Sequence, residues 1–505
     1  MIFERLFQKW GLLRRPEHHG SAGWASASRD LMLPKHAVLS LGAFLIGEQN
    51  GRPVALPRAE TLKHGLIVGG SGTGKSRGYF IPNAFHSRGT SLVCTDPKSE
   101  LWRLTSGTRE RAVRYAPADP DASSGFNWIP LCREPRTAEL CARALVESGN
   151  TQGTEQAWLD TEAAFLSGVF AHAATMEFPT PLTAYRLFTR QPVESLIEVL
   201  LHSPSEAARE QGMVFSQTNE RMRGSIVPVV AARLQFLRDP AVARFTSAEL
   251  TAPDFSVLRR SPTALYWCLR ESDIARLRPL TALFFSVLLE SLASGDEQGS
   301  GVPVTMLLDE FANVGTIPNF ETTISLARGR GVALWLGIQS LGQLEARYGK
   351  ANARTIVSNC GAKVALSGLD VDSAEYFSRA LGEATVEGRS SSRHGTLSPT
   401  YGETESEHGR RLMTADEVRR IPSDKAIVLA GNRRPLLLTK HWHDEPSVAA
   451  QTSSLGKARG ETIEPVPAES PPEMPSELRA EEPLRKSDRS VRAAEERRNG
   501  RTGRR

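Results

Sequence analysis

Short apolar runs alternate with amphipathic stretches along most of the chain, and their order predicts the secondary structure. In the first quarter, Leu66–Val68 and Ser91–Thr95 are predicted strands that enclose a glycine-rich loop and a helix. A strand, a turn, a helix and a second strand are the start of a parallel α/β sheet. Further strand-like runs are Thr263–Leu269, Val304–Leu308, Ala333–Ile338, Lys363–Ser367 and Ala426–Ala430. We therefore expect an α/β fold with a mostly parallel sheet.

The pattern changes from strands to helices between residues 136 and 255. Helical periodicity dominates Gln156–Met176, Glu194–His202 and a stretch around Asn219–Phe236. Because strand-like runs return after this region, it predicts an all-α domain inserted into the sheet domain.

Three further segments lie outside the predicted sheet and the predicted helical region. The stretch 386–411 is rich in Ser, Gly and Thr and is predicted to be a mobile loop. Residues 446–505 are rich in Pro, Glu, Arg and Ser, which predicts a disordered tail. Residues 1–15 carry apolar side chains at near-helical spacing with basic residues between them. They predict a helix that lies on a membrane surface or docks on a protein.

Composition limits the possible functions. The chain has 505 residues, of which 40% are hydrophobic and 24% charged, so several domains can bury a core. A net charge of +5 is compatible with nucleic-acid binding but does not establish it. The five cysteines form no CxxC pair, which argues against a disulfide framework or a zinc ribbon. No apolar run approaches the roughly 20 residues that span a bilayer, so we expect no transmembrane helix.

A glycine-rich loop after the first predicted strand matches the phosphate-binding pattern GxxxxGK[ST]. Its residues are Gly69, Gly70, Ser71, Gly72, Thr73, Gly74, Lys75 and Ser76. Such a loop lets backbone amides surround a phosphate, and the following helix N-terminus favours the same anion. Lys75 would reach the β- and γ-phosphates of ATP, and Ser76 would ligate Mg²⁺. The alternative is a glycine-rich turn that binds no ligand.

A second predicted strand ends in the carboxylates that such a site requires. Val304–Leu308 is followed directly by Asp309 and Glu310. Asp309 is the natural partner of Mg²⁺, and Glu310 is the natural base to polarise water that attacks the γ-phosphate. The predicted helical insertion explains the long separation of these residues from the glycine-rich loop.

Polar residues near the next strand have more than one possible role. Gln339 follows Ala333–Ile338 directly, where RecA-like motors often place a residue that senses the γ-phosphate. It could instead cap the next helix. Arg328 and Arg330 could reach a neighbouring subunit's nucleotide or DNA, or they could be solvated surface charges.

Several longer segments resemble the TraG/TraD family of type IV secretion coupling proteins. They include HGLIVGGSGTGKSRGYFIPN, the DPKSELW stretch from Asp96, LLDEFANVGTIPNFETTISLARGRGVALWLGIQSLGQLEARYG, TIVSNCGAKVALSG and RRLMTADEVRRIPSDKAIVL. HGSAGWAS from His19 also fits, and GFNWIP is similar except that Trp128 replaces the usual proline. The resemblance extends from about residue 19 to residue 445.

The resemblance implies a RecA-like P-loop ATPase core with an inserted all-α domain. The expected division is an N-terminal segment (1–60), the first section of the motor domain (61–135), the all-α domain (136–255), the second section of the motor domain (256–445) and the disordered tail (446–505). The family also implies a homo-hexamer around a central channel. Its members bring relaxase-bound single-stranded DNA, or protein substrates, to the inner-membrane components of a type IV secretion system, and ATP hydrolysis drives conjugative transfer. The P-loop, Asp309, Glu310 and Gln339 match the family's motor positions, whereas no arginine finger is assigned.

One departure concerns the membrane. Family members usually begin with transmembrane helices, and this sequence shows none. The start could be truncated, the anchor could be another protein, or residues 1–15 could suffice, so we expect a cytoplasmic protein peripheral to the inner face of the cell membrane. Three other functions remain open: a cytosolic DNA translocase similar to FtsK or HerA, a coupling ATPase for protein effectors only, and a nucleotide-binding scaffold without hydrolysis. Intact Glu310 argues against the scaffold.

Overall fold

The computed structural model describes most of the chain. The described residues are 20–34, 39, 41–149, 155–247, 252–294, 301–394, 400–444 and 461–462. The predicted N-terminal helix (1–15) lies outside them, as does the predicted tail apart from two residues. Among the described helices, none is both long and apolar enough to cross a bilayer.

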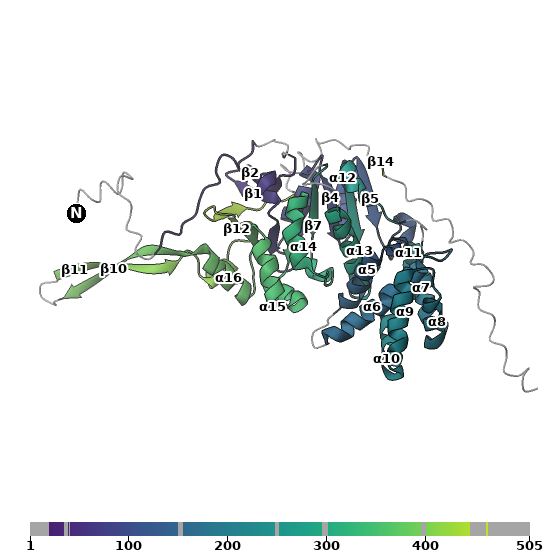
Figure 1. Cartoon of the computed structure of the whole chain (residues 1–505). Coiled ribbons are helices and arrows are strands. Elements are labelled where there is room, and N and C mark those ends of the chain that lie inside the picture. Colours follow the sequence, from purple (N-terminus) through teal and green to yellow (C-terminus); the bar gives the residue numbers. More distant parts are fainter. Residues whose placement is uncertain are drawn as a thin grey trace, which may run out of the picture.

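A twelve-stranded sheet forms the body of the protein (Figure 1). Its strand order is β14-β5-β6-β4-β7-β8-β3-β9-β12-β13-β1-β2. The strands are β1 (Phe44–Gln49), β2 (Arg52–Leu56), β3 (Gly65–Val68), β4 (Ser91–Asp96), β5 (Arg111–Tyr115), β6 (Thr263–Cys268), β7 (Val304–Leu308), β8 (Val332–Ile338), β9 (Ala362–Ala365), β12 (Lys425–Ala430), β13 (Leu436–Thr439) and β14 (Glu461–Thr462). The strands from β5 to β9 in this order are parallel, and the pairs from β9 to β2 are antiparallel.

Side-chain alternation along the central strands builds a core on each face of the sheet. In β3, Leu66 and Val68 belong to one buried cluster, and Ile67 belongs to the other. Successive strand residues point to opposite faces, so one strand contributes to both cores. The helices are α2 (Arg58–Thr61), α3 (Ile81–His86), α4 (Glu100–Thr105), α5 (Pro135–Glu147), α6 (Gln156–Ala173), α7 (Pro181–Thr189), α8 (Val193–Leu201), α9 (Glu206–Gln217), α10 (Glu220–Arg233), α11 (Pro240–Ser247), α12 (Val257–Arg260), α13 (Ile274–Ser294), α14 (Phe320–Ala327), α15 (Leu341–Asn359), α16 (Val371–Leu381) and α17 (Ala415–Arg419).

The predicted helical region is observed between β5 and β6. Helices α6 to α10 gather at one end of the molecule, beyond the sheet (Figure 1). Their starts follow ordinary capping rules: Ser205 accepts a hydrogen bond from Ala208 N–H at α9, and Asn219 accepts one from Met222 N–H at α10. The Glu162 carboxylate is buried in this region, where it pairs with Arg233 at 3.2 Å.

The prediction of a mobile loop at 386–411 is wrong. Strands β10 (Glu383–His394) and β11 (Thr400–Arg411) form an antiparallel hairpin, with Glu383 opposite Arg411 and His394 opposite Thr400. The hairpin extends away from the sheet (Figure 1). Backbone pairing needs no apolar alternation. The Ser, Gly and Thr content of this segment suggested a loop because it lacks an apolar strand pattern. The two strands nevertheless pair along their length.

Candidate functional site

The glycine-rich loop joins β3 to the π-helical turn Ser76–Phe80, which leads into α3. Gly72 and Gly74 have φ values of +75° and +92°, a region that favours glycine. At Gly69 a Cβ atom would lie 2.6 Å from Thr73 Oγ1, so the loop also closes too tightly there for a side chain. The backbone conformation therefore favours glycine at positions 72 and 74, and neighbouring side chains leave no room for a Cβ atom at position 69.

Lys75 is directed back into this loop. Its side chain is buried, and its ammonium donates to Gly69 O at 2.8 Å and to Gly70 O at 3.2 Å. The ammonium also lies 3.3 Å from Glu310 Oε1. The ammonium is therefore held within the loop by two carbonyl oxygens and one carboxylate oxygen.

Asp309 follows β7 and lies next to the loop. Ser76 Oγ donates a hydrogen bond to Asp309 Oδ2, and Thr95 Oγ1 donates to the Asp309 carbonyl at 2.7 Å. Burial raises the pKa of Asp309 to about 6, while the hydrogen bond from Ser76 and the charge of Lys75 act in the opposite direction. The structure thus brings the two predicted Mg²⁺ ligands into direct contact.

Glu310 follows Asp309 in the sequence and contacts Gln339, the residue that follows β8. Its backbone has φ 51° and ψ 47°, an uncommon conformation for a residue other than glycine. Gln339 Nε2 donates to Glu310 Oε2 at 3.0 Å. The alternative that Gln339 caps the next helix is wrong, because Ser340 is the N-cap of α15 and accepts from Gln343 N–H.

Sequence reasoning missed a segment that covers the outside of the loop. We call residues 440–444, which follow β13, the strap. Lys440 Nζ donates to Thr73 O at 2.7 Å, and Trp442 packs against Gly74. No motif identifies these residues as part of the site. The only local feature of the sequence is Lys440, which directly follows the apolar strand β13.

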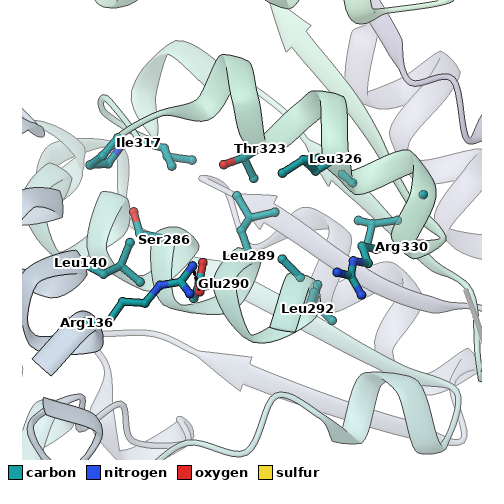
Figure 2. Close-up of a pocket in the computed structure, with 15 residues that line it drawn as sticks. Arg136, Leu140, Ser286, Leu289, Glu290, Leu292, Ile317, Thr323, Leu326 and Arg330 are labelled. Carbon is teal, nitrogen blue, oxygen red and sulfur yellow. Dashed lines mark ion pairs between the residues drawn. The ribbon is translucent and has the colours of Figure 1, made fainter. Parts of the chain in front are cut away.

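The two candidate arginines lie outside this cluster. Arg328 is exposed on the turn after α14, and Arg330 lines a separate pocket of about 720 Å³ between α5, α13 and α14 (Figure 2). An ion pair between Arg136 and Glu290, at 3.0 Å, borders this pocket (Figure 2). None of its lining residues belongs to the glycine-rich loop, so the pocket is not part of the candidate site.

Comparison with known proteins shows which family this sequence resembles. Residues 28–460 match the family described as type IV secretory system conjugative DNA transfer. The chain is 28% identical over 473 residues to the conjugal transfer protein TraG of Escherichia coli, covering 81% of this chain and 71% of that protein. It is also 28% identical over 459 residues to protein VirD4 of Rhizobium rhizogenes, covering 85% and 66%. The chain thus spans about two thirds of the length of such relatives.

Solved structures share the fold. The bacterial conjugative coupling protein TrwBdeltaN70, in its unbound monoclinic form, has a TM-score of 0.64 and 20% identity, covering 86% of this chain and 99% of that one. TrwB in complex with the ATP analogue ADPNP has a TM-score of 0.63. These similarities confirm the predicted α/β fold class. Since the family match covers most of the sequence, the chain belongs to the type IV secretory system conjugative DNA transfer family.

Proposed function

We propose that this protein is an ATPase that couples ATP hydrolysis to conjugative DNA transfer. It would bring relaxase-bound single-stranded DNA to the inner-membrane components of a type IV secretion system. The observation that carries the proposal is the contact of Lys75, Ser76, Asp309 and Glu310 in a member of this family. These side chains come from two distant regions of the sequence and meet at the carboxyl edge of the sheet.

The residues fit a nucleotide with Mg²⁺. The Lys75 ammonium is held by loop carbonyls, and a triphosphate would offer it stronger anionic partners. Ser76 and Asp309 supply adjacent oxygen atoms, the ligand type that Mg²⁺ prefers. When bound, Mg²⁺ would neutralise charge on the phosphates. TrwB itself has been solved with ADP and Mg²⁺.

Glu310 is the proposed base, and Gln339 is the proposed sensor of the γ-phosphate, which also donates a hydrogen bond to Glu310. The Glu310 carboxylate is half-buried and lies between Lys75 and Gln339. From this position it can accept a proton from a water molecule while Gln339 holds its second oxygen. Hydrolysis rather than binding alone is therefore the expected activity.

The finer assignments follow from the family and the sequence. A homo-hexamer would enclose the transferred strand, and Arg328 or Arg330 would be available to an adjacent subunit or to DNA. Peripheral attachment at the inner membrane would use residues 1–15, whose apolar and basic residues suit an anionic lipid surface. Flotation with anionic liposomes, comparing the full chain with one that lacks residues 1–15, tests this attachment. Equal flotation of both forms would contradict it.

Measurement of ATP turnover with and without single-stranded DNA tests the main proposal. We expect DNA to stimulate turnover, and we expect Lys75→Ala to abolish it. The exposed Lys98, which forms an ion pair with Glu271 at 3.6 Å, provides the control Lys98→Ala. Absence of turnover under every DNA condition would support the scaffold alternative instead.

A deletion strain separates the coupling function from its alternatives. We expect conjugation to fail while chromosome segregation remains normal. Failed segregation would indicate the FtsK- or HerA-like translocase. Normal plasmid transfer with lost effector export would indicate the effector-only protein.

A further inference from the structure

We propose that Lys440 is a positioning residue for nucleotide phosphates, acting through the backbone of the glycine-rich loop. It would hold the Thr73 carbonyl outward and thereby direct the Gly74 amide toward the phosphates. Trp442 of the strap would keep the loop in this conformation. The inference rests on the proposed nucleotide binding and adds residues that no motif identifies.

The first observation is the environment of Lys440. The residue is 1% exposed, and its ammonium donates to Thr73 O and to Ser423 O, each at 2.7 Å. The ammonium also lies 5.3 Å from the centre of the Trp442 ring. Two of the three ammonium donors therefore have carbonyl acceptors, and the aromatic ring lies close enough to stabilise the positive charge. Burial lowers the pKa of Lys440 to about 8, so the group still carries its charge at pH 7.

The second observation is the geometry of the peptide that Lys440 contacts. The described peptide bonds are all trans, and in a trans peptide the C=O and the next N–H point in opposite directions. The Thr73 carbonyl points to Lys440, so the Gly74 N–H points away from it. Lys75 and Ser76 follow directly in the chain. A phosphate held by those two side chains would therefore be offered the Gly74 amide as an additional donor.

The third observation is the packing of Trp442 against the loop. A Cβ atom on Gly74 would lie 2.4 Å from Trp442 Cζ3, and one on Gly78 would lie 3.5 Å from it. The Arg77 guanidinium lies 4.5 Å from the ring centre and forms an ion pair with Asp444 at 2.6 Å. The ring is therefore fixed between the glycine backbone and Arg77, and it leaves Gly74 little room to move toward the strap.

Through these contacts the strap supports the glycine-rich loop, and the loop in turn would contact the phosphates. A loop of small residues is flexible, and ordering it upon binding costs conformational entropy. A buried lysine that fixes one of its peptides reduces this cost before the ligand arrives. The effect should not depend on the base of the ligand, so it should appear with a nucleotide and with a phosphate chain that has no base.

Calorimetric titration of the full chain with Mg²⁺-ADPNP and with Mg²⁺-pyrophosphate tests the inference. Lys440→Met removes the donors and retains much of the apolar stem. Lys440→Arg keeps a cationic donor. Lys425→Met is the matched control, because Lys425 lies on the neighbouring strand β12 and donates to Thr439 Oγ1 at 2.7 Å.

We expect Lys440→Met to raise the Kd of both probes by about tenfold. This is the effect of losing one hydrogen bond to a charged group, here the bond from the Gly74 amide to a phosphate. Lys440→Arg should recover part of the affinity, and Lys425→Met should stay within about twofold of the wild type. Unchanged affinity of folded Lys440→Met would overturn the inference. If the wild-type chain binds neither probe, the proposed nucleotide binding itself fails.

A variant with reduced stability remains informative. Trp442→Phe retains an aromatic ring beside Gly74 and leaves Lys440 in place. We expect it to weaken both probes by about two- to threefold, with an unchanged ratio between them. A purely structural strap would lower the unfolding temperature of the ligand-free protein and leave both Kd values of the folded fraction unchanged, which would contradict the inference.

Discussion

Ser76 Oγ donates a hydrogen bond to the Asp309 carboxylate, although 233 positions separate the two residues in the sequence. The contact exists because β3 and β7 are parallel to the same strand, β8, and end at the same edge of the sheet. The carboxyl edge of a parallel sheet is where ligands bind in α/β proteins. The pair thus defines where Mg²⁺ would be held.

Replacement of Glu310 should separate nucleotide binding from hydrolysis. In Glu310→Gln we expect ATP turnover to fall by about 10²- to 10⁴-fold, the usual contribution of a general base. Nucleotide affinity should be retained or rise, because Lys75 loses its carboxylate partner at 3.3 Å. Steady-state kinetics and calorimetry measure the two effects. The exposed Glu271 provides the control Glu271→Gln, and full turnover in Glu310→Gln would refute the assigned base.

Loss of the Gln339 side chain should affect the rate more than the affinity. Its amide donates to Glu310 Oε2 at 3.0 Å, and a hydrogen bond to a charged group is worth about tenfold or more in an equilibrium constant. We therefore expect Gln339→Ala to lower kcat by about tenfold with a nearly unchanged nucleotide Kd. Gln156→Ala, on the exposed start of α6, should change neither quantity. A change in Kd alone would assign Gln339 to binding instead.

A methyl group added at Gly337 should disturb the candidate site by crowding Phe80 and Asp309. Its Cβ would lie 2.7 Å from Phe80 Cε2 and 3.1 Å from Asp309 Oδ1. We expect Gly337→Ala to lower the free energy of unfolding by about 1–3 kcal/mol, as overpacking does, and to weaken Mg²⁺-dependent nucleotide binding. Urea unfolding and calorimetry check both effects. Gly107→Ala meets no atom within 4 Å and should be close to neutral.

His64 should make stability depend on pH. Burial lowers its pKa to about 4, and its Nδ1 accepts a hydrogen bond from Leu334 N–H at 3.1 Å. The unfolded chain binds a proton near pH 6.5, whereas the folded chain does so only near pH 4. Stability is therefore lost as the pH falls through this interval, by up to about 1.4 kcal/mol per pH unit.

Urea unfolding at pH 7.5 and pH 5 measures this dependence. His64→Asn removes the titrating ring and tolerates the backbone φ of +63°. Its stability should fall less than that of the wild type between the two pH values. Burial also lowers the pKa of His86, but His86 is present in both proteins and cancels in the difference. Equal losses in the two proteins would show that His64 does not contribute.

The central strands and the loop were predictable because their signals are local. Strands such as β7 are buried along their whole length, so they form continuous apolar runs. The GxxxxGK[ST] motif identifies Lys75 and Ser76, and the Asp309 and Glu310 carboxylates directly follow the recognisable strand β7. Parallel pairing then brings both groups to one edge without further information. Helix α8 was predictable for a similar reason, since its apolar positions recur at helical spacing.

Other features depend on contacts between distant segments. The hairpin of β10 and β11 is mostly polar, and strand β5 has a half-polar sequence, so neither shows the apolar run by which strands are recognised. The contact of Lys440 with Thr73 depends on where β13 ends relative to the loop. The positive φ of Glu310 likewise has no marker in the sequence.

Calorimetric titration of ADPNP, with and without Mg²⁺, into the wild-type chain and Asp309→Asn is the most direct test. We expect one site per chain in the wild type, with tighter binding when Mg²⁺ is present. We expect Asp309→Asn to lose this dependence on Mg²⁺. Absence of binding to the folded wild-type protein, or an unchanged Mg²⁺ dependence in Asp309→Asn, would contradict it.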